Sequence, residues 1–449
     1  MLWATMGTMV SIAFGRARQN DIYTSGIHGR KPTVPADFAE LERRARAVMS
    51  RRGWAYIAGG AGEGRTMDAN RDALDRWAIV PRMLRDTSQR NLETELFGQK
   101  LDAPVLFSPV GAGALAHPNA DVHIGEAAAQ LGVPYIFSNQ GCAPMEDVAA
   151  AMDAVKPGAP RWFQLYWSTD DRLVTSLINR AEKMGAAALV VTLDTTMLGW
   201  RPQDLNLGSL PFARAEGISQ YTSDPSFWEI VGERLKAATA EKPEVSLGAI
   251  KTLFSIARNV PGDLRENLTK PEPRAAVQTF LDIYSRPSLN WDDIATLRDR
   301  TSLPIVLKGI LHPDDALLAL EAGIDGIIVS NHGGRQIDGS ISSTDALVDI
   351  VDAVGGRAGS RASGRKSDRG MKILVDSGFY TGSDVFKGLA LGADAVCIGR
   401  PHMYGLALDG TDGARDAVAN IIGELDLTLG LSGHRDVNDL NRSALKRLG

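Results

Sequence analysis

The chain has 449 residues, of which 44% are hydrophobic and 23% are charged, the composition of an ordinary globular protein. Its net charge of −5 gives no reason to expect a nucleic-acid partner or a membrane surface. Only Cys142 and Cys397 are present, which excludes a disulfide framework and fits a reducing compartment, so we expect a cytoplasmic protein. No apolar run reaches the roughly 18 residues that a membrane-spanning helix needs.

The first 100 residues precede the regular part of the chain. Residues 1–35 begin with an apolar stretch, but the positive charges follow it instead of preceding it. We therefore interpret them as an N-terminal tail and not as a signal peptide. Residues 36–100 show helical patterns and a short hairpin pattern, which indicate a helical cap in front of the main domain.

From about residue 100 onward, eight short runs rich in Val, Ile and Leu alternate with amphipathic stretches of helical period. Continuous apolar runs of this length are typical of parallel strands that are buried on both faces. The runs cover residues 103–111, 134–139, 161–167, 187–195, 304–309, 325–331, 371–378 and 394–400. Eight strands, each followed by a helix, predict an α/β fold of the (β/α)₈ TIM-barrel class.

The competing architecture is a doubly wound open sheet. Such a sheet rarely needs eight parallel strands, and no G-x-G-x-x-G motif follows the first strand. We therefore predict one barrel domain over residues 36–440 and a C-terminal tail over residues 441–449. Residues 203–290, between the fourth and fifth strands, are too long for a connecting loop and carry helical patterns, so we expect a lid-like insertion.

The residues after the sixth predicted strand carry the strongest chemical signal, because functional side chains of barrels gather at the carboxyl ends of the strands. The sequence SNHGGRQIDG places His332, which can exchange a proton near neutral pH, three residues before Arg335. The planar guanidinium of Arg335 can grip a carboxylate through two parallel bonds. Either residue alone would often be structural, but the pair, separated by two glycines that let a ligand approach, favours a substrate site.

Other strand ends add polar residues to the same face. Lys308 ends the fifth strand; taken alone it would be a lysine that extends to solvent, but in a site it would stabilise negative charge. Asp194 ends the fourth strand and could orient an imidazole. Further polar residues at or near strand ends are Ser138, Gln164, Tyr166 and Arg201.

The loops after the seventh and eighth strands are where barrels commonly bind phosphate. The sequences VDSGFYTG and IGRP supply Gly378, Gly399 and Arg400 there, which offer open backbone amides and a guanidinium. These residues indicate a phosphorylated cofactor and not merely a small substrate. We predict no metal site.

The segments VLKG, SNHGGRQ, VDSG with TGSDVFKGLALGA, and IGRP resemble those of the FMN-dependent α-hydroxy acid oxidase and dehydrogenase family, in the family's order. The resemblance covers residues 36–440. Within the family, WAYIAGGAG, PRMLRDTSQRNLETELFG, TLDTTMLGWRPQDL and KGILHPDDA most resemble lactate 2-monooxygenase. The resemblance implies FMN as cofactor and oxidation of a small L-2-hydroxy acid.

The resemblance also implies roles for individual residues. His332 matches the base that removes the substrate proton, Asp194 the carboxylate that stabilises its imidazolium, and Tyr166 a tyrosine that bonds the substrate hydroxyl. The implied substrate-binding residues are Arg335, Tyr56, Arg201 and Gln140. The implied FMN-binding residues are Val110, Gly111, Ser138, Gln164, Thr192, Lys308, Ser330, Asp376, Gly378, Gly399 and Arg400.

Three features depart from the family pattern. Tyr380 stands where the family usually has an arginine against the FMN phosphate, which leaves Arg400 as the remaining guanidinium and predicts looser FMN binding. Gln140 stands where relatives often carry Trp or Leu, which predicts a substrate with a more polar or larger side chain than lactate. The insertion at residues 203–290 is longer than in most relatives, so the lid is expected to differ.

Several functions stay open at this point. O₂ is the expected electron acceptor, in an oxidase or in a monooxygenase whose product decarboxylates in the closed site; a dehydrogenase with another acceptor is the alternative. A barrel isomerase or aldolase that uses Lys308 as a Schiff-base former would leave His332, Asp194 and Tyr166 unexplained. A flavin-binding relative without turnover, or with an altered substrate, is a further alternative. We expect a homotetramer or a homo-octamer.

Overall fold

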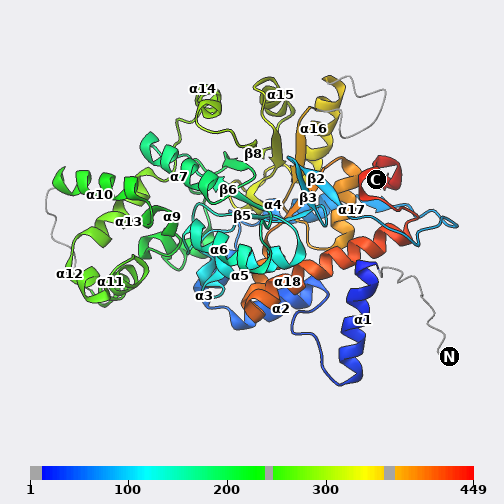
Figure 1. Ribbon diagram of the computed structural model, residues 1–449, viewed down its shortest axis with the longest axis horizontal. Helices are drawn as coiled ribbons and strands as arrows, with labels where there is room; N and C mark the ends of the chain where they lie inside the picture. The colour runs from blue at the N-terminus through cyan, green and yellow to red at the C-terminus, as the bar shows by residue number, and fades with distance from the viewer. Residues whose placement is uncertain (1–12, 238–245, 358–369, 449) are drawn as a thin grey trace, which may run out of the picture.

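Eight parallel strands close into a barrel at the centre of the molecule (Figure 1). The computed structural model describes residues 13–237, 246–357 and 370–448. Around the barrel the strands follow the order β10-β11-β4-β5-β6-β7-β8-β9. Their bounds are β4 Val105–Phe107, β5 Tyr135–Phe137, β6 Arg161–Leu165, β7 Leu189–Thr192, β8 Ile305–Ile310, β9 Gly326–Val329, β10 Lys372–Val375 and β11 Ala395–Ile398. Each strand coincides with one of the eight predicted runs, with β8 extending one residue past its run to Ile310, and this confirms the TIM barrel against the open sheet.

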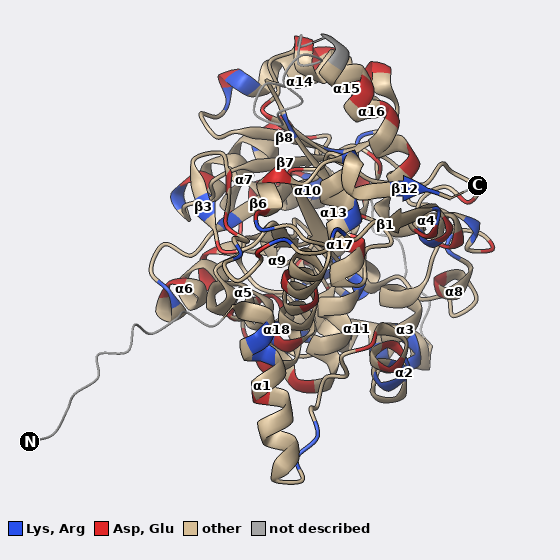
Figure 2. Cartoon of the chain, turned by 90° about the vertical axis from the view of Figure 1, so that its right-hand side faces the viewer, with Lys and Arg blue, Asp and Glu red and all other residues tan. Residues whose placement is uncertain are grey.

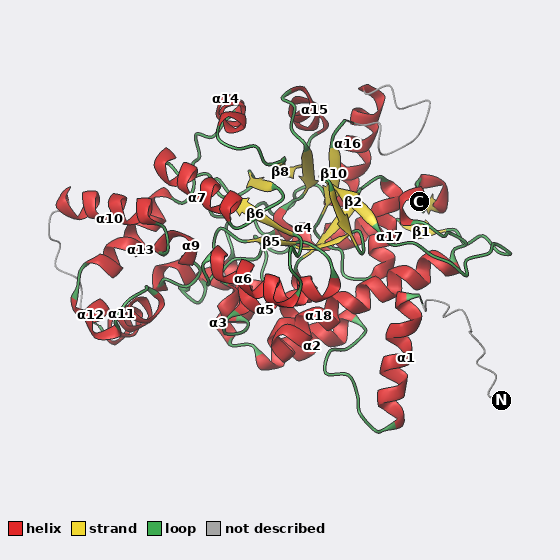
Figure 3. Ribbon diagram, viewed as in Figure 1, coloured by secondary structure: helices red, strands yellow, loops and turns green. Residues whose placement is uncertain are grey.

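Helices cover the outside of the barrel, drawn in red around the yellow strands in Figure 3. They are α5 Ala120–Leu131, α6 Met145–Val155, α7 Asp171–Lys183, α14 Trp291–Ala295, α15 Pro313–Glu321, α16 Ser343–Arg357, α17 Gly382–Leu391 and α18 Arg400–Leu431. Local sequence fixes their ends: Asp170 caps α7, and Thr381 and Asp384 form a capping box on α17. Figure 2 shows Lys and Arg interspersed with Asp and Glu over these helices on the face in view.

The interior of the barrel is apolar at its lower, N-terminal end. One buried cluster inside it contains Leu106, Ile136, Trp162, Val190, Val306, Ile328 and Leu374. The predicted hairpin is confirmed as β2 (Thr94–Leu96) and β3 (Gln99–Leu101), and its Leu96 and Leu101 join this cluster and close the bottom of the barrel. Because the lower half is filled, polar groups can face a ligand at the upper ends of the strands.

The helical cap is also confirmed. Its helices are α2 (Phe38–Val48), α3 (Arg51–Ala58) and α4 (Arg65–Asp75). Helix α4 is fixed to the end of β9, because the amides of Asn70 and Asn331 exchange two hydrogen bonds of 3.0 and 2.7 Å. The cap therefore reaches the carboxyl ends of the strands, where the predicted site residues stand.

Both chain ends carry more structure than the tails that the sequence predicted. Residues 1–12 lie outside the described part, but helix α1 (Phe14–Ile27) packs on α18. At the other end, β12 (Leu445–Arg447) pairs antiparallel with β1 (Trp77–Ile79). The sequence did not predict these elements, because they gain their stability from partners hundreds of residues away, which no local pattern reveals. The extent of the barrel domain stays a prediction.

The insertion between β7 and β8 is a helical layer beside the barrel, drawn in green at the left of Figure 1. Its helices are α8 Pro202–Leu205, α9 Ser219–Thr222, α10 Pro225–Ala237, α11 Leu247–Asn259, α12 Leu264–Thr269 and α13 Glu272–Ile283, with a 3₁₀ turn η2 at Pro211–Arg214. Phe212, Tyr221, Phe227 and Phe280 are buried in it and contact one another at ring-centroid distances of 4.7–5.7 Å. Among the described helices of the chain, none is long and apolar enough to cross a membrane.

Arg52 of α3 ties the insertion to the cap. Its guanidinium contacts both sides of the η2 turn, with Nε 3.0 Å from the Ser209 hydroxyl and Nη2 2.6 Å from a Glu216 carboxylate oxygen. The side chains of Arg52 and Glu216 are 31% and 17% exposed, so solvent screens this ion pair only in part. Arg52 thus holds the segment that carries Phe212 against the helix that carries Tyr56.

We expect Arg52→Met to loosen the segment of residues 209–216 without unfolding the barrel. Loss of a half-buried ion pair worth about 1 kcal/mol should raise amide hydrogen exchange there about fivefold. Hydrogen-exchange mass spectrometry measures this. Arg172→Met is the control, because Arg172 also joins a barrel helix to the insertion through Glu233, but in an exposed pair. Equal exchange in both variants would contradict the anchoring role of Arg52.

Candidate active site

A cleft of about 990 Å³, open to solvent, lies at the carboxyl ends of the barrel strands. Most of the predicted site residues line it, although they come from segments between the cap and the loop after β11. They are Tyr56, Val110, Gly111, Gln140, Tyr166, Arg201, Lys308, His332, Arg335, Asp376, Gly378, Gly399 and Arg400.

The other predicted site residues lie just behind this lining. At the carboxyl ends of β5, β6 and β7, the Ser138 hydroxyl donates to the Gln164 amide oxygen at 3.2 Å, and the Gln164 amide donates to Thr192 at 2.8 Å. Ser330 accepts a hydrogen bond of 2.7 Å from the ammonium group of Lys308. These contacts join neighbouring strands and fix the floor of the cleft.

The loop after β9 turns sharply to bring His332 to the cleft. His332, Gly333 and Gly334 all have left-handed backbone conformations, with φ of 58°, 66° and 74°. Such a φ is strained for a residue with a side chain, and glycine adopts it freely. A Cβ at Gly334 would also lie 2.7 Å from Cγ of Met67. The two glycines of the HGGR sequence are therefore required by the turn that orients His332.

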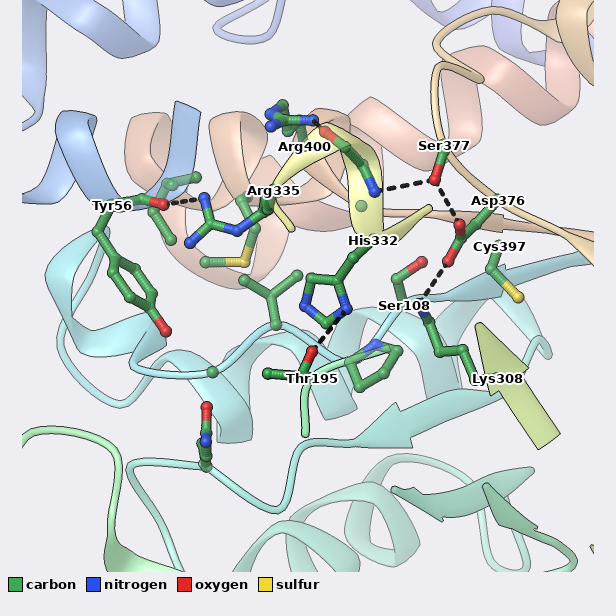
Figure 4. A pocket seen from close by; sticks show the side chains of 18 of the residues that line it. Tyr56, Ser108, Thr195, Lys308, His332, Arg335, Asp376, Ser377, Cys397 and Arg400 are labelled. Carbon is green, nitrogen blue, oxygen red and sulfur yellow. Dashed lines mark hydrogen bonds and ion pairs between the residues drawn. The ribbon is translucent and has the colours of Figure 1, made fainter. Parts of the chain in front are cut away.

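His332 and Asp194 form a hydrogen-bonded pair at the cleft. His332 Nδ1 lies 2.7 Å from Asp194 Oδ1. The Thr195 hydroxyl lies 3.3 Å from the same nitrogen, and Figure 4 shows this second contact. A carboxylate at this distance fixes the proton on Nδ1, so that Nε2 is the basic nitrogen. Within the described part of the chain, Nε2 has no hydrogen-bond partner. It can accept a proton from a bound molecule.

Burial and the neighbouring charges shift the pKa of each group in this pair in opposite directions. Burial lowers the pKa of His332 below its ordinary value, against the attraction of Asp194, so the imidazole is neutral at pH 7. For Asp194, burial is outweighed by His332 and Lys308, and its pKa falls to about 2. A neutral imidazole beside a permanent carboxylate can take a proton and have the resulting charge stabilised.

Lys308 is a buried cation at the centre of the cleft floor. Its Nζ lies 3.0 Å from Asp376 and 3.9 Å from Asp194, and the side chain is 5% exposed. Burial lowers the pKa of Lys308, but the two carboxylates outweigh it and the pKa is raised. Lys308 is therefore a fixed positive charge and not a neutral amine.

Among the residues that the structure describes, the guanidinium of Arg335 has no carboxylate partner. Its Nη1 donates to the backbone carbonyls of Tyr56 and Gly59, and the guanidinium lies 5.0 Å from the centroid of the Tyr56 ring. Burial, with the charge of nearby Arg201, lowers the pKa of Arg335 to about 9. A half-buried cation held by neutral carbonyls is a strong site for an anion, because the anion would supply the counter-charge that the guanidinium lacks.

The loops after β10 and β11 form the other end of the cleft. Gly378 has φ of 88°, and a Cβ there would lie 2.8 Å from Cβ of Asn70, so this loop needs glycine. Arg400 donates to the carbonyls of Gly333 and Gly59, each at 3.0 Å. Its Nε is buried and has no hydrogen-bond partner within the described residues. This end therefore has an unused donor for an anionic group.

Several cleft residues were not predicted. Thr195 follows Asp194 directly and could have been found from the sequence TLDTT. Ser377 accepts a hydrogen bond of 2.9 Å from the Gly333 amide, which joins the loops after β9 and β10. Phe212 and Tyr284 come from the insertion, and no local signal connects them with the barrel. The other unpredicted lining residues include Ser108, Pro109, Leu198, Phe379, Cys397 and Met403.

The fold and the site define a TIM-barrel enzyme with a histidine–aspartate pair and an anion-binding arginine. The loops after β10 and β11 form an open end of its cleft that suits a phosphate group. The sequence profile of FMN-dependent dehydrogenases matches residues 45–447, nearly the whole chain. The chain belongs to the FMN-dependent dehydrogenase family, whose members oxidise 2-hydroxy acids with FMN.

Curated relatives align over almost their full length. An FMN-dependent α-hydroxy acid dehydrogenase, qulF, of Penicillium citrinum is 40% identical over 441 residues, 98% of each chain. An L-lactate oxidase of Lysinibacillus sphaericus is 39% identical over 425 residues, 95% of this chain and 96% of the relative. A 4-hydroxymandelate oxidase of Amycolatopsis orientalis is 34% identical over 404 residues, 90% and 96%. These relatives are oxidases and a dehydrogenase, so the narrower likeness to lactate 2-monooxygenase stays a proposal.

Solved structures agree with this assignment. Mandelate oxidase crystallised with (S)-4-hydroxymandelic acid is 33% identical with a TM-score of 0.72, and the match covers 92% of this chain and 99% of that one. A mandelate oxidase variant with an FMN adduct is 32% identical with a TM-score of 0.68, over 91% and 99% of the two chains.

The residues present fit FMN. Lys308 is a buried cation suited to the electron-rich edge of a reduced flavin, and Arg400 Nε is an unused buried donor suited to phosphate. At Gly399, an added Cβ would meet only Ser108, at 3.9 Å, so the backbone is open to a ligand. FMN is therefore the cofactor of this enzyme.

The ionisation of the His332–Asp194 pair leads to a testable pH dependence. At low substrate concentration, the flavin reduction rate should rise with pH, with a midpoint below about pH 6.5, the ordinary pKa of histidine, because burial lowers the pKa of His332, and should level off above that midpoint. Asp194→Asn should lower the plateau about 100-fold and shift the acid limb to lower pH, because the imidazolium loses its counter-charge. Anaerobic stopped-flow absorbance measures both quantities. An acid limb that moves to higher pH in the variant would contradict the pairing.

Proposed function

We propose that this protein oxidises an L-2-hydroxy acid to the 2-oxo acid and passes the electrons to O₂. The observation that carries the proposal is that one cleft holds a neutral His332, paired with Asp194, and the guanidinium of Arg335, which is held by neutral backbone carbonyls. A 2-hydroxy acid offers a removable proton beside a carboxylate, which matches these two groups. The oxidase activity named for relatives at 34% and 39% identity supports O₂ as the acceptor.

In the proposed reaction three residues act on the substrate's hydroxyl-bearing carbon. His332 Nε2 takes a proton that the substrate releases as it is oxidised, and Asp194 stabilises the imidazolium that results. Burial raises the pKa of Tyr166, so its hydroxyl stays protonated and can donate a hydrogen bond to the substrate hydroxyl. All three are positioned by strand ends or by the loop that follows a strand, which favours a rigid geometry.

The substrate carboxylate is proposed to bind Arg335, with Tyr56 and Arg201 beside it. Arg201 is 6% exposed and is fixed by hydrogen bonds from Nε to the Arg335 carbonyl at 3.1 Å and from Nη2 to Gln336 at 2.7 Å. Two arginines in one buried region concentrate positive charge where an anion enters. This arrangement favours an acid over the corresponding alcohol or amide.

FMN, when bound, supplies the two-electron acceptor of the reaction. We propose that the carboxyl ends of the strands and the loops that follow them hold it. Lys308 would hold the negative charge that the flavin gains, and Asp376 keeps Lys308 protonated. The other proposed FMN-binding residues are Val110, Gly111, Ser138, Gln164, Thr192, Ser330, Gly378, Gly399 and Arg400.

The side chain of the substrate is proposed to face Gln140. This residue is 6% exposed and lines the cleft, and among the described residues its side-chain amide has no hydrogen-bond partner. An unpaired amide that faces the cleft favours a substrate with a polar group of its own, because an apolar group bound there would cover the amide without giving it a partner. Phe212 and Tyr284 add an aromatic wall, so we propose a hydroxy acid larger than lactate, of the kind named for the 4-hydroxymandelate oxidase relative.

The competing functions are less well supported. A Schiff-base aldolase would need a neutral lysine, whereas two carboxylates keep Lys308 charged. Oxidative decarboxylation, as in lactate 2-monooxygenase, and transfer to an acceptor other than O₂ use the same residues, so the products must separate them. The cytoplasmic location and the homotetramer or homo-octamer also stay predictions.

The proposed function is tested by mixing the purified protein, without O₂, with a panel of L- and D-2-hydroxy acids. The yellow absorbance of the flavin should disappear with an L-acid and not with its D-isomer. On admission of O₂, hydrogen peroxide and the 2-oxo acid identify an oxidase, and CO₂ with the shortened acid identifies a monooxygenase. No re-oxidation by O₂ would identify a different acceptor, and no bleaching by any 2-hydroxy acid would overturn the proposal.

Arg335→Lys should weaken binding of the substrate carboxylate, because lysine keeps the charge but cannot form two parallel bonds. Loss of one charge-assisted bond, about 1.5–3 kcal/mol, corresponds to a roughly 10- to 150-fold loss of affinity for oxalate. The flavin spectral shift on oxalate binding measures it. Arg234→Lys, in an exposed ion pair on the insertion, is the control. If both variants bind oxalate as the wild type does, Arg335 is not the carboxylate site.

Gln140→Leu should change which substrate is preferred. Replacing an unpaired amide by an apolar group should raise kcat/KM for L-lactate relative to a hydroxy acid with a polar side chain by about tenfold, in the range that one pocket contact gives. Steady-state oxidation of both substrates by each variant provides the ratio. The inference is wrong if lactate is already the best substrate of the wild type and the ratio stays the same.

A further inference from the structure

Tyr380 lies in the loop after β10 and is packed between two helices of the N-terminal cap. Its ring stacks on Phe38, the first residue of α2, with centroids 3.9 Å apart and planes 11° apart. The guanidinium of Arg71, on α4, lies 4.9 Å from the centroid of the same ring. Tyr380 lines the cleft, and within the described part of the chain its hydroxyl has no hydrogen-bond partner.

Arg71 also holds the loop that contains Tyr380. Its Nη1 donates to the carbonyl of Gly378 and, at 2.7 Å, to Oδ2 of Asp384. The same Asp384 oxygen accepts the backbone amides of Tyr380 at 3.0 Å and Thr381 at 3.1 Å. The loop after β10 is thus fixed from behind by one carboxylate and one guanidinium.

The charge of Asp384 makes this arrangement more than a structural brace. Its side chain is 4% exposed, and Arg71 is the cation that pairs with it. Without Arg71, a buried negative charge would stand behind the loop of residues 376–382 and would repel a phosphate dianion on the cleft side. With Arg71 present, the pair is neutral and the loop can accept the dianion.

We propose that Arg71 is a positioning residue that makes the flavin site selective for the phosphorylated cofactor, acting through Asp384 and Tyr380. Arg71 cancels the charge of Asp384, keeps the Gly378 carbonyl turned toward α4, and packs on the ring whose hydroxyl is left to donate to phosphate. This chain therefore replaces a direct guanidinium contact at position 380 by an indirect one from the cap. The inference rests on the proposed placement of the FMN phosphate at the loops after β10 and β11.

The test compares FMN with riboflavin, which lacks the phosphate, on full-length Arg71→Met. The FMN dissociation constant should rise about tenfold at low salt, because an uncompensated carboxylate then faces the dianion. Riboflavin affinity should stay within about twofold, because its neutral end feels no net repulsion. The FMN effect should shrink toward high salt, since Arg71 is 32% exposed and ions screen the site. Flavin fluorescence on binding provides both constants.

Two further variants keep the result interpretable. Arg76→Met removes a similar ion pair, between Arg76 and Asp345, at the end of the same helix. This variant should bind FMN and riboflavin with unchanged affinity. Arg71→Lys keeps the charge and should recover most of the FMN affinity. If Arg71→Met weakens FMN and riboflavin by the same factor, or weakens neither, the inference is overturned.

Arg400→Met separates this inference from the placement of the phosphate. If Arg400→Met loses more affinity for FMN than for riboflavin and Arg71→Met does not, the proposed phosphate position is supported and the role of Arg71 is overturned. No selective loss in either variant would overturn the placement itself. Selective loss in both supports the proposal.

Discussion

Lys308 brings a full positive charge to the upper end of an otherwise apolar barrel. It lies on β8, and its partners Asp194, Ser330 and Asp376 follow β7, β9 and β10. A buried cation is costly unless it is paired, so these strand ends are held together by the need to neutralise it. The same carboxylate that contacts Lys308 also orients His332. One charge therefore fixes both the floor of the cofactor site and the direction of the reactive imidazole.

The sequence predicted the barrel well because its strands are continuous apolar runs with polar residues at their carboxyl ends. The sequence also predicted one common site for His332, Arg335, Lys308 and Gly378, because the carboxyl ends of all parallel barrel strands lie on one face. These four residues do line one cleft. The sequence did not predict β1 or β12, because each is a short segment that pairs with a segment near the other end of the chain.

The missed parts of the site share a physical cause. Phe212 and Tyr284 reach the cleft through packing inside the insertion, and Arg71 reaches the loop after β10 from the outer side of the cap. Such contacts depend on how separate elements pack and not on a pattern within any one of them. From the sequence, Tyr380 indicated only that the arginine usual at this position is missing. The structure places the guanidinium of Arg71 against the Tyr380 ring.

The hairpin that fills the lower end of the barrel has a consequence for the order of events in catalysis. Because β2 and β3 close that end with Leu96 and Leu101, the cleft opens at the upper end, where Phe212 and Tyr284 of the insertion line it. In the proposed reaction with O₂, substrate and product would use this opening, and O₂ would meet the reduced cofactor either after the 2-oxo acid has left or while the acid is still bound. Under that proposal the residence time of the product would decide between release of peroxide and decarboxylation, so substitutions in the insertion would change the product without altering the barrel.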